Sequence, residues 1–180
     1  MRTRRRRPLV RDLTGRDSTK RWAAAVELAR TRDERTRRQV ARVLEGTGND
    51  DGRAAAAYVL GFSGDTAFAG VLARRLADPD ECVLVRAHAA EALGHLLQHE
   101  PVLADIRTAI VAALTDEEAE VRFWATFAAG ALELQESRPR LERLLGDEAS
   151  VEGWWTVAQE AEWALRCLDG ELHPPLPDRV

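Results

Sequence analysis

Apolar residues recur every three or four positions in five stretches of the chain, which is the periodicity of an amphipathic helix. The stretches are rich in Ala and Leu, which favour helix, and none contains Pro. They span residues 20–29, 52–61, 85–94, 121–130 and 157–166. Their first residues are 32, 33, 36 and 36 positions apart, so the pattern predicts one unit repeated along the whole chain.

A second set of apolar-periodic segments lies between these stretches and predicts a partner helix in each unit. The segments are residues 34–44, 66–76, 102–114 and 138–145. Three of them end in Leu, one further residue and then Asp, at Asp78, Asp116 and Asp147. Asp there breaks one helix and is able to cap the next. We therefore expect a helix–turn–helix unit, repeated about four and a half times, that buries its apolar face against its neighbours.

The residues at matching positions of these units resemble a known repeat family. An Asp is followed after a short gap by Val-Arg and by an Ala-rich helix that ends in Gly. The matching residues are Asp80, Val85, Arg86, Ala89, Leu93 and Gly94, then Asp116, Val121, Arg122, Ala125 and Gly130, with Arg53, Ala56, Leu60 and Gly61 in the preceding unit. The pattern resembles the HEAT repeat in its short bacterial form, which is also seen in phycobilin lyase subunits.

This resemblance implies an all-α fold, a right-handed α-solenoid of about four to five HEAT-like repeats over residues 17–169. We expect a basic N-terminal tail at 1–16 and a Pro-rich C-terminal tail at 170–180. The last unit departs from the pattern, with Ala158 in place of the Arg and Arg166 in place of the Gly. Such an atypical unit is typical of the capped end of an array. Of the adjacent Trp154 and Trp155, we expect one to cap this end and the other to reach the groove edge.

Aligning the five Ala-rich helices on the Arg position, counted as zero, separates core from surface. Position three is Ala in every unit and position seven is Leu in four of five, so these columns form the core face. Positions two, five and nine lie on the opposite face and carry aromatic and ionisable side chains, which suit partner recognition. By the resemblance this face lines a concave groove. The candidate partner-binding residues are Tyr58, His88, Glu91, His95, Trp124, Phe127 and Trp163.

Two other interpretations of these columns stay open. In a short, strongly curved array the position-five aromatics would pack against the neighbouring unit and belong to the core. The Arg column invites a phosphate site, but the resemblance implies a structural ladder in which each Arg pairs with the preceding loop Asp. We assign Arg53, Arg86, Arg122, Asp50, Asp80 and Asp116 to that ladder.

The sequence offers no catalytic constellation. It contains no GxGxxG, GxxxxGK[ST], GxSxG or HExxH motif, and Cys82 and Cys167 have no metal-site or nucleophile context. His88, Glu91 and His95 share one helix face, and we interpret them as a hydrogen-bonding cluster rather than a metal site. We expect a non-enzymatic module without metal or cofactor that binds another protein or peptide in its groove. Its oligomeric state stays open.

Charge is distributed unevenly. Residues 1–42 hold 15 basic and 5 acidic side chains, a net charge of +10, whereas residues 43–180 carry −14. The groove columns offer only one Arg, Arg30, which disfavours a nucleic-acid partner there. On the helix predicted at 34–44, Arg35, Arg38 and Arg42 share one face. We favour a solvated basic face, or a basic tail docked on acidic repeats of this or another chain, over a nonspecific phosphate contact.

Two alternative functions follow from the resemblance alone. Some HEAT-like bacterial alkylpurine DNA glycosylases use groove Trp and acidic residues, which Trp124, Trp163 and Glu91 would imitate. A bilin lyase-like chaperone is the other. The N-terminal MRTRRRRPLVRDL has no apolar run of a secretory signal and no stretch of about 18 apolar residues occurs, so we expect a cytoplasmic protein with no membrane contact.

Overall fold

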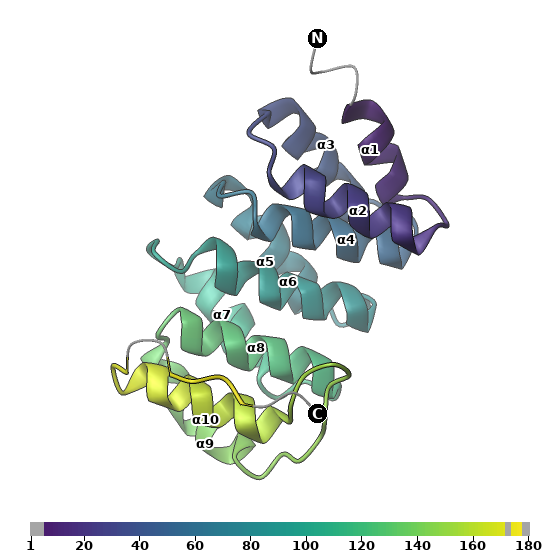
Figure 1. Ribbon diagram of the computed structural model, residues 1–180. Helices are drawn as coiled ribbons and strands as arrows, with labels where there is room; N and C mark the ends of the chain where they lie inside the picture. Colours follow the sequence, from purple (N-terminus) through teal and green to yellow (C-terminus); the bar gives the residue numbers. More distant parts are fainter. Residues whose placement is uncertain (1–5, 172–173, 178–180) are drawn as a thin grey trace.

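The computed structural model describes residues 6–171 and 174–177, and in these residues the chain folds as a stack of helical hairpins (Figure 1). The first helices of the hairpins form one layer. They are α1 (Arg6–Leu13), α3 (Glu34–Glu45), α5 (Ala69–Ala77), α7 (Ala104–Ala113) and α9 (Arg138–Leu144). The second helices form the other layer, as α2 (Ser18–Ala29), α4 (Asp50–Gly61), α6 (Val83–Leu96), α8 (Ala119–Ala131) and α10 (Val157–Leu168). Short 3-10 turns, η2 (Thr66–Phe68) and η3 (Gln135–Ser137), lead into α5 and α9.

The predicted all-α solenoid is confirmed. Each of the five Ala-rich stretches is a second helix, and each intervening segment is the first helix of the next hairpin. Side-chain caps help to set where the early helices begin, because Asp17, Asp33 and Asn49 each accept a backbone N–H of the first turn that has no partner inside the helix. Among the described helices, none has both the length and the apolar character needed to cross a bilayer.

The N-terminal boundary differs from the prediction. Residues 6–13, expected as part of a basic tail, form α1, which packs against α2, and Leu13 is fully buried. Leu9, Val10 and Leu13 supply an apolar stripe that the surrounding arginines obscure in the sequence. The array therefore contains five hairpins instead of about four and a half. Residues 1–5 of the predicted tail lie outside the described part of the chain.

The loop aspartates end helices as expected but do not cap the following ones. The residues at the N-caps of α6, α8 and α10 are Cys82, Glu118 and Thr156. One oxygen of Asp116 instead accepts the backbone N–H of Glu118, and the other accepts an Arg from the preceding hairpin. Asp116 and Asp147 thus hold their own loop and join it to the previous unit, whereas in the loop after α5 it is Glu81 that pairs with Arg53 of the previous unit.

A ladder of arginines joins consecutive hairpins. The side chain of Arg21 lies 2.5 Å from Asp51, that of Arg53 2.9 Å from Glu81, that of Arg86 2.7 Å from Asp116 and that of Arg122 2.7 Å from Asp147. Each arginine therefore reaches forward to the next hairpin, at the first turn of its second helix or the loop before it. The predicted pairing with the preceding Asp is present only at Arg53, which also contacts Asp50 at 2.5 Å. Arg86 pairs with Asp116 rather than with Asp80.

The second helices approach one another most closely at a glycine seam, which we define as Gly61, Gly94 and Gly130 at position eight of three consecutive units. A Cβ added to Gly61 would lie 2.6 Å from the Cα of Ala92, and one added to Gly130 would lie 2.8 Å from the Cα of Ala164. Backbone atoms cannot yield at that distance, so only Gly fits. The second helices consequently pack more closely together than the first helices, which places them on the inner side of the stack.

We expect Gly61→Ala to destabilise the protein by about 1–3 kcal/mol, because the added methyl group overpacks the contact with Ala92. Gly70→Ala, in α5, is the matched control. Its Cβ would meet only the flexible Arg74 side chain at 3.7 Å, so the substitution should be neutral or stabilise by up to about 1 kcal/mol through helix propensity. Urea unfolding measures both variants. Equal effects of the two substitutions on the free energy of unfolding would contradict the claim that only Gly fits at position 61.

Candidate partner-binding face

Neighbouring repeats cover two flanks of α4, α6 and α8 and leave one strip open on the inner side. At position two, Ala55, Trp124 and Glu160 are buried in packing. Positions five and nine line the open strip, where side chains are half-buried or exposed. Of the three columns predicted to form one groove face, position two is therefore mostly buried in packing, whereas positions five and nine border the open surface.

Six rings form a continuous aromatic row along this strip, from α2 to α10. Consecutive ring centroids lie 5.7, 4.8, 4.5, 4.8 and 5.8 Å apart, which is the distance range of favourable aromatic pairs. In order, the members of the aromatic row are Trp22, Tyr58, Phe62, His95, Phe127 and Trp163. Side chains from all five hairpins therefore meet in one line.

The aromatic row is most open at its N-terminal end. Trp22 is 37% exposed and Phe62 42%, and Val26 beside them is 41% exposed. Phe127 and Trp163 are half-buried because they lie over the glycine seam, where a Cβ on Gly94 or Gly130 would come within 3 Å of their rings. The position-five aromatics thus pack against the neighbouring unit and also border the open strip.

His88, Glu91 and His95 surround the middle of the aromatic row. The Nδ1 of His88 lies 2.7 Å from a carboxylate oxygen of Glu91, and its ring packs against Trp22 at 5.5 Å. Burial between Phe62 and Phe127 lowers the pKa of His95, with Glu91 opposing the shift, which favours the neutral imidazole. In the described residues no three ligating side chains converge as a metal site would require.

Trp124 lies in packing rather than on the open strip where we expected it. It is 7% exposed because Trp154 covers it, with the two ring centroids 5.1 Å apart. Trp155 is 3% exposed and donates its indole N–H to the buried carboxylate of Glu160 at 2.6 Å. The two adjacent tryptophans therefore pack together against Phe123 of the preceding unit, and neither reaches the open strip, contrary to the prediction for one of them.

Both the buried Glu160 and the half-buried Cys167 of α10 have raised pKa values. Burial raises the pKa of Glu160 to about 7, although the hydrogen bond from Trp155 opposes the shift. Burial, assisted by the nearby Glu160, raises the pKa of Cys167 to about 11, so its thiol stays protonated at neutral pH. A protonated thiol is a poor nucleophile.

Trp22 and Phe62 are the most open aromatic residues of the face, and the predicted site set contained neither. Phe62 stands at position nine, a column that the alignment assigned to the groove. Trp22 stands at position one, which in the later units is buried against the next hairpin, as Ala54, Ala87 and Phe123 show. Its large ring extends past that contact to reach Tyr58 and His88.

We expect Glu160→Gln to stabilise the protein at pH 8 by about 3 kcal/mol and to have little effect near pH 4. The folded state keeps the proton of Glu160 up to about pH 7, whereas the unfolded chain releases it near 4.5, so wild type loses stability as the pH rises between these values. Glu162→Gln, an exposed residue of the same helix, is the control. Thermal unfolding from pH 4 to pH 8 measures the difference, and a pH-independent effect of Glu160→Gln would contradict it.

Similar folds occur in solved structures. The complex of CpcE and CpcF of phycocyanin lyase from Nostoc sp. PCC7120 aligns with a TM-score of 0.69 and 21% identity, over 91% of this chain and 64% of that chain. This chain thus spans less than two thirds of that relative. An engineered protein aligns with a TM-score of 0.59 and 22% identity, over 91% of this chain and 79% of the other. At these identities the likeness shows the fold alone.

No curated protein sequence matches this chain. The family described as HEAT repeats matches it twice, over residues 7–94 and 79–166. The first match begins within α1, in agreement with a complete first hairpin. The two matches together cover the five hairpins, so the chain belongs to the HEAT-repeat family.

Proposed function

We propose that this chain is a non-catalytic interaction module that binds another protein along the aromatic row. The observation that carries the proposal is the continuity of the row across all five hairpins, with an open end at Trp22 and Phe62. The partner's apolar side chains would seat against Trp22, Val26 and Phe62 and continue toward His95.

The chemistry of the open end suits a protein partner. Exposed aromatic side chains that cluster gain free energy when a second surface excludes water from them, and Trp and Tyr dominate binding energy at protein interfaces. The neighbouring rings hold Trp22 and Phe62 in place, so binding immobilises few side chains. Polar groups at the margin, such as the exposed Arg30 and the His88–Glu91 pair, would fix the partner's orientation.

The comparison with the lyase supports a protein partner in a further respect. The solved lyase structure is itself a complex of two subunits, CpcE and CpcF. This is a precedent for a HEAT-like array of similar fold that works within a protein assembly. It supports the class of partner proposed for this chain and does not identify the partner.

The lyase similarity also favours a second candidate, a chaperone for a flat conjugated chromophore. The rings of Phe127 and Trp163 are nearly parallel, with an interplanar angle of 18°, and both border the open strip. Absorption spectra of the full chain titrated with a linear tetrapyrrole provide the test. A shifted visible band that Trp163→Ala abolishes would support this candidate, and an unchanged spectrum would reject it.

A glycosylase-like use of the groove fits the geometry less well. Of the three residues that would imitate that site, Trp124 is buried beneath Trp154 and Glu91 is engaged by His88. Trp163 is half-buried and stacks on Phe127. The set therefore does not present a free acidic group beside an open indole.

We expect the double substitution Trp22→Ala/Phe62→Ala to abolish partner binding while leaving the fold intact, because both side chains lie on the surface, 37% and 42% exposed. Affinity capture from the native cell extract, followed by titration calorimetry with the purified partner, measures the loss. Leu103→Ala/Leu145→Ala is the control, since these leucines are 65% and 46% exposed but lie on the first-helix side of the array.

The expected result is a protein that wild type and the leucine variant retain and the aromatic variant loses. Circular dichroism must match for all three forms. Retention of the same proteins by the aromatic variant would show that the row serves packing alone.

A further inference from the structure

The arginines of this protein fall into two groups according to their ion pairs. After residue 42, eight of the ten described arginines have a carboxylate within ion-pair distance. Before residue 43, nine arginines have described side chains, and only three of them, Arg21, Arg37 and Arg38, have a carboxylate within ion-pair distance. The six without such a partner among the described residues are Arg11, Arg16, Arg30, Arg32, Arg35 and Arg42. The excess positive charge of the first two hairpins is therefore not neutralised within the described fold.

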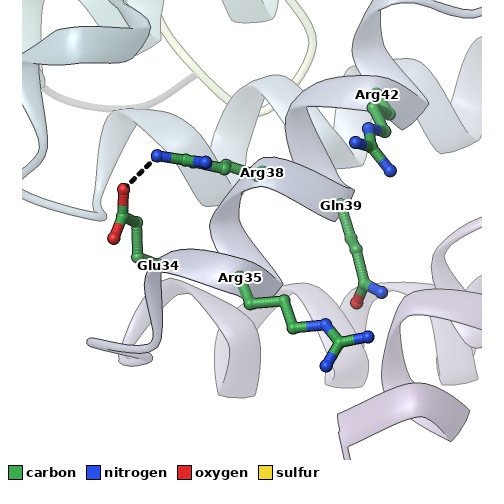
Figure 2. Close-up of a pocket in the computed structure, with 5 residues that line it drawn as sticks. All are labelled: Glu34, Arg35, Arg38, Gln39 and Arg42. Carbon is green, nitrogen blue, oxygen red and sulfur yellow. Dashed lines mark hydrogen bonds and ion pairs between the residues drawn. The ribbon is translucent and has the colours of Figure 1, made fainter.

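Part of this charge is concentrated on the outer surface of α3, which we define as the basic face (Arg35, Arg38, Gln39 and Arg42). Together with Glu34 these residues line a shallow depression, and the three arginines are exposed (Figure 2). Figure 2 shows Arg38 turned toward Glu34, at 2.5 Å, while Arg35 and Gln39 extend on another flank of the helix. The buried side of α3, with Val40 and Leu44, faces the core and fixes the orientation of the basic face.

The composition of the basic face differs from that of a protein interface. The centre of a protein interface is enriched in aromatic residues and depleted of charge, and burial of apolar area supplies much of its energy. The basic face presents no aromatic or aliphatic anchor, only guanidinium groups and one amide. Binding there must draw on charge, and isolated surface ion pairs contribute little, about 0–1 kcal/mol each. A ligand of high linear charge density gains far more, because neutralising its phosphates releases condensed counterions.

We propose that the basic face of α3 binds the phosphate backbone of a nucleic acid without reading its bases. Arg35 and Arg42 would each contact phosphate oxygens, and the Gln39 amide would donate to a further oxygen between them. Arg11 on the adjoining α1 adds an exposed cation to the same two hairpins. Arginines 2, 4, 5, 6 and 7 extend this series in the sequence, although their side chains lie outside the described residues.

The basic face and the aromatic row lie on opposite layers of the array. The former belongs to a first helix, and the latter runs along the second helices, which form the inner layer. The groove is short of cations, which disfavours nucleic acid there, but this does not apply to the outer surface. Both surfaces would be available at once, so the module would be able to hold a protein partner on a nucleic acid.

The test is fluorescence anisotropy with the full chain and a labelled 20-base-pair DNA duplex over a range of salt concentrations. We expect Arg35→Gln/Arg42→Gln to weaken binding about tenfold or more at low salt. We also expect it to reduce the slope of log K against log salt by about 1.8, since each lost phosphate contact removes about 0.9. The variant keeps the Arg38–Glu34 pair, and both substituted side chains are exposed, so folding should be unaffected.

Arg140→Gln/Arg143→Gln in α9 is the matched control, because it removes the same charge from the corresponding helix of the last hairpin. These two arginines likewise have no carboxylate partner among the described residues. The two α9 substitutions should leave the affinity for the duplex and the slope of log K against log salt near their wild-type values. Arg35→Lys/Arg42→Lys should retain most of the binding, and two duplexes of unrelated sequence should bind within about twofold, as expected without base readout.

Two outcomes would overturn the proposal. Equal weakening by the α3 and α9 glutamine variants would show that net charge, and not the basic face, sets the affinity. A poly-glutamate peptide of equal charge that binds as tightly as the duplex would assign the basic face to an acidic protein. A duplex of RNA with the same sequence separates the two kinds of nucleic acid, and binding of either one that depends on Arg35 and Arg42 supports the proposal.

Discussion

The close approach of the second helices at the glycine seam is the constraint on which the rest of the structure depends. Without a Cβ at Gly94 and Gly130, the backbones of α6, α8 and α10 come close enough for the next unit's position-five ring to lie over the glycine. Phe127 and Trp163 occupy those places. A larger residue would separate the helices and break the ring contacts, so the aromatic row exists because the seam is made of glycine. The absence of a Cβ at the seam therefore accounts both for the close packing of the second helices and for the positions of Phe127 and Trp163 in the aromatic row.

The arginine ladder, like the glycine seam, joins each unit to the one after it. Seam and ladder both join nearest neighbours, as expected for an array whose stability is a sum of adjacent contacts. The last unit lacks both elements, since Ala158 replaces the Arg and Arg166 the Gly. Trp154 and Trp155 of this unit pack against Phe123 and Trp124 of the preceding unit, at the cost of burying the Glu160 carboxyl.

Much of the fold could be predicted from the sequence, because the repeat displays its period five times over. The position-three alanines, which include Ala24 and Ala161, are all buried as their column required. A column specifies the angle of a residue around its own helix but not the neighbour that it meets. For that reason the columns predict an exposed Trp124, which is in fact buried. The resemblance to the repeat family predicts Asp80 as the partner of Arg86, whereas the partner is Asp116. The helix at 6–13 was missed because three apolar residues among arginines give too weak a periodic signal.

The two ends of this short array differ in how much aromatic surface and unpaired charge they expose, and this difference bears on the proposed function. At the C-terminal end the inner strip is occupied by the stacked rings of Phe127 and Trp163, and Arg138 and Arg166 are paired with carboxylates. At the N-terminal end Trp22, Val26 and Phe62 are open on the inner layer. The unpartnered arginines lie in the same hairpins, those of α3 on the outer layer. Exposed aromatic surface and uncompensated charge each cost free energy in the isolated chain, and neither is needed to hold five hairpins together. Their concentration in the first two units supports the proposal that these units make the contacts with other molecules.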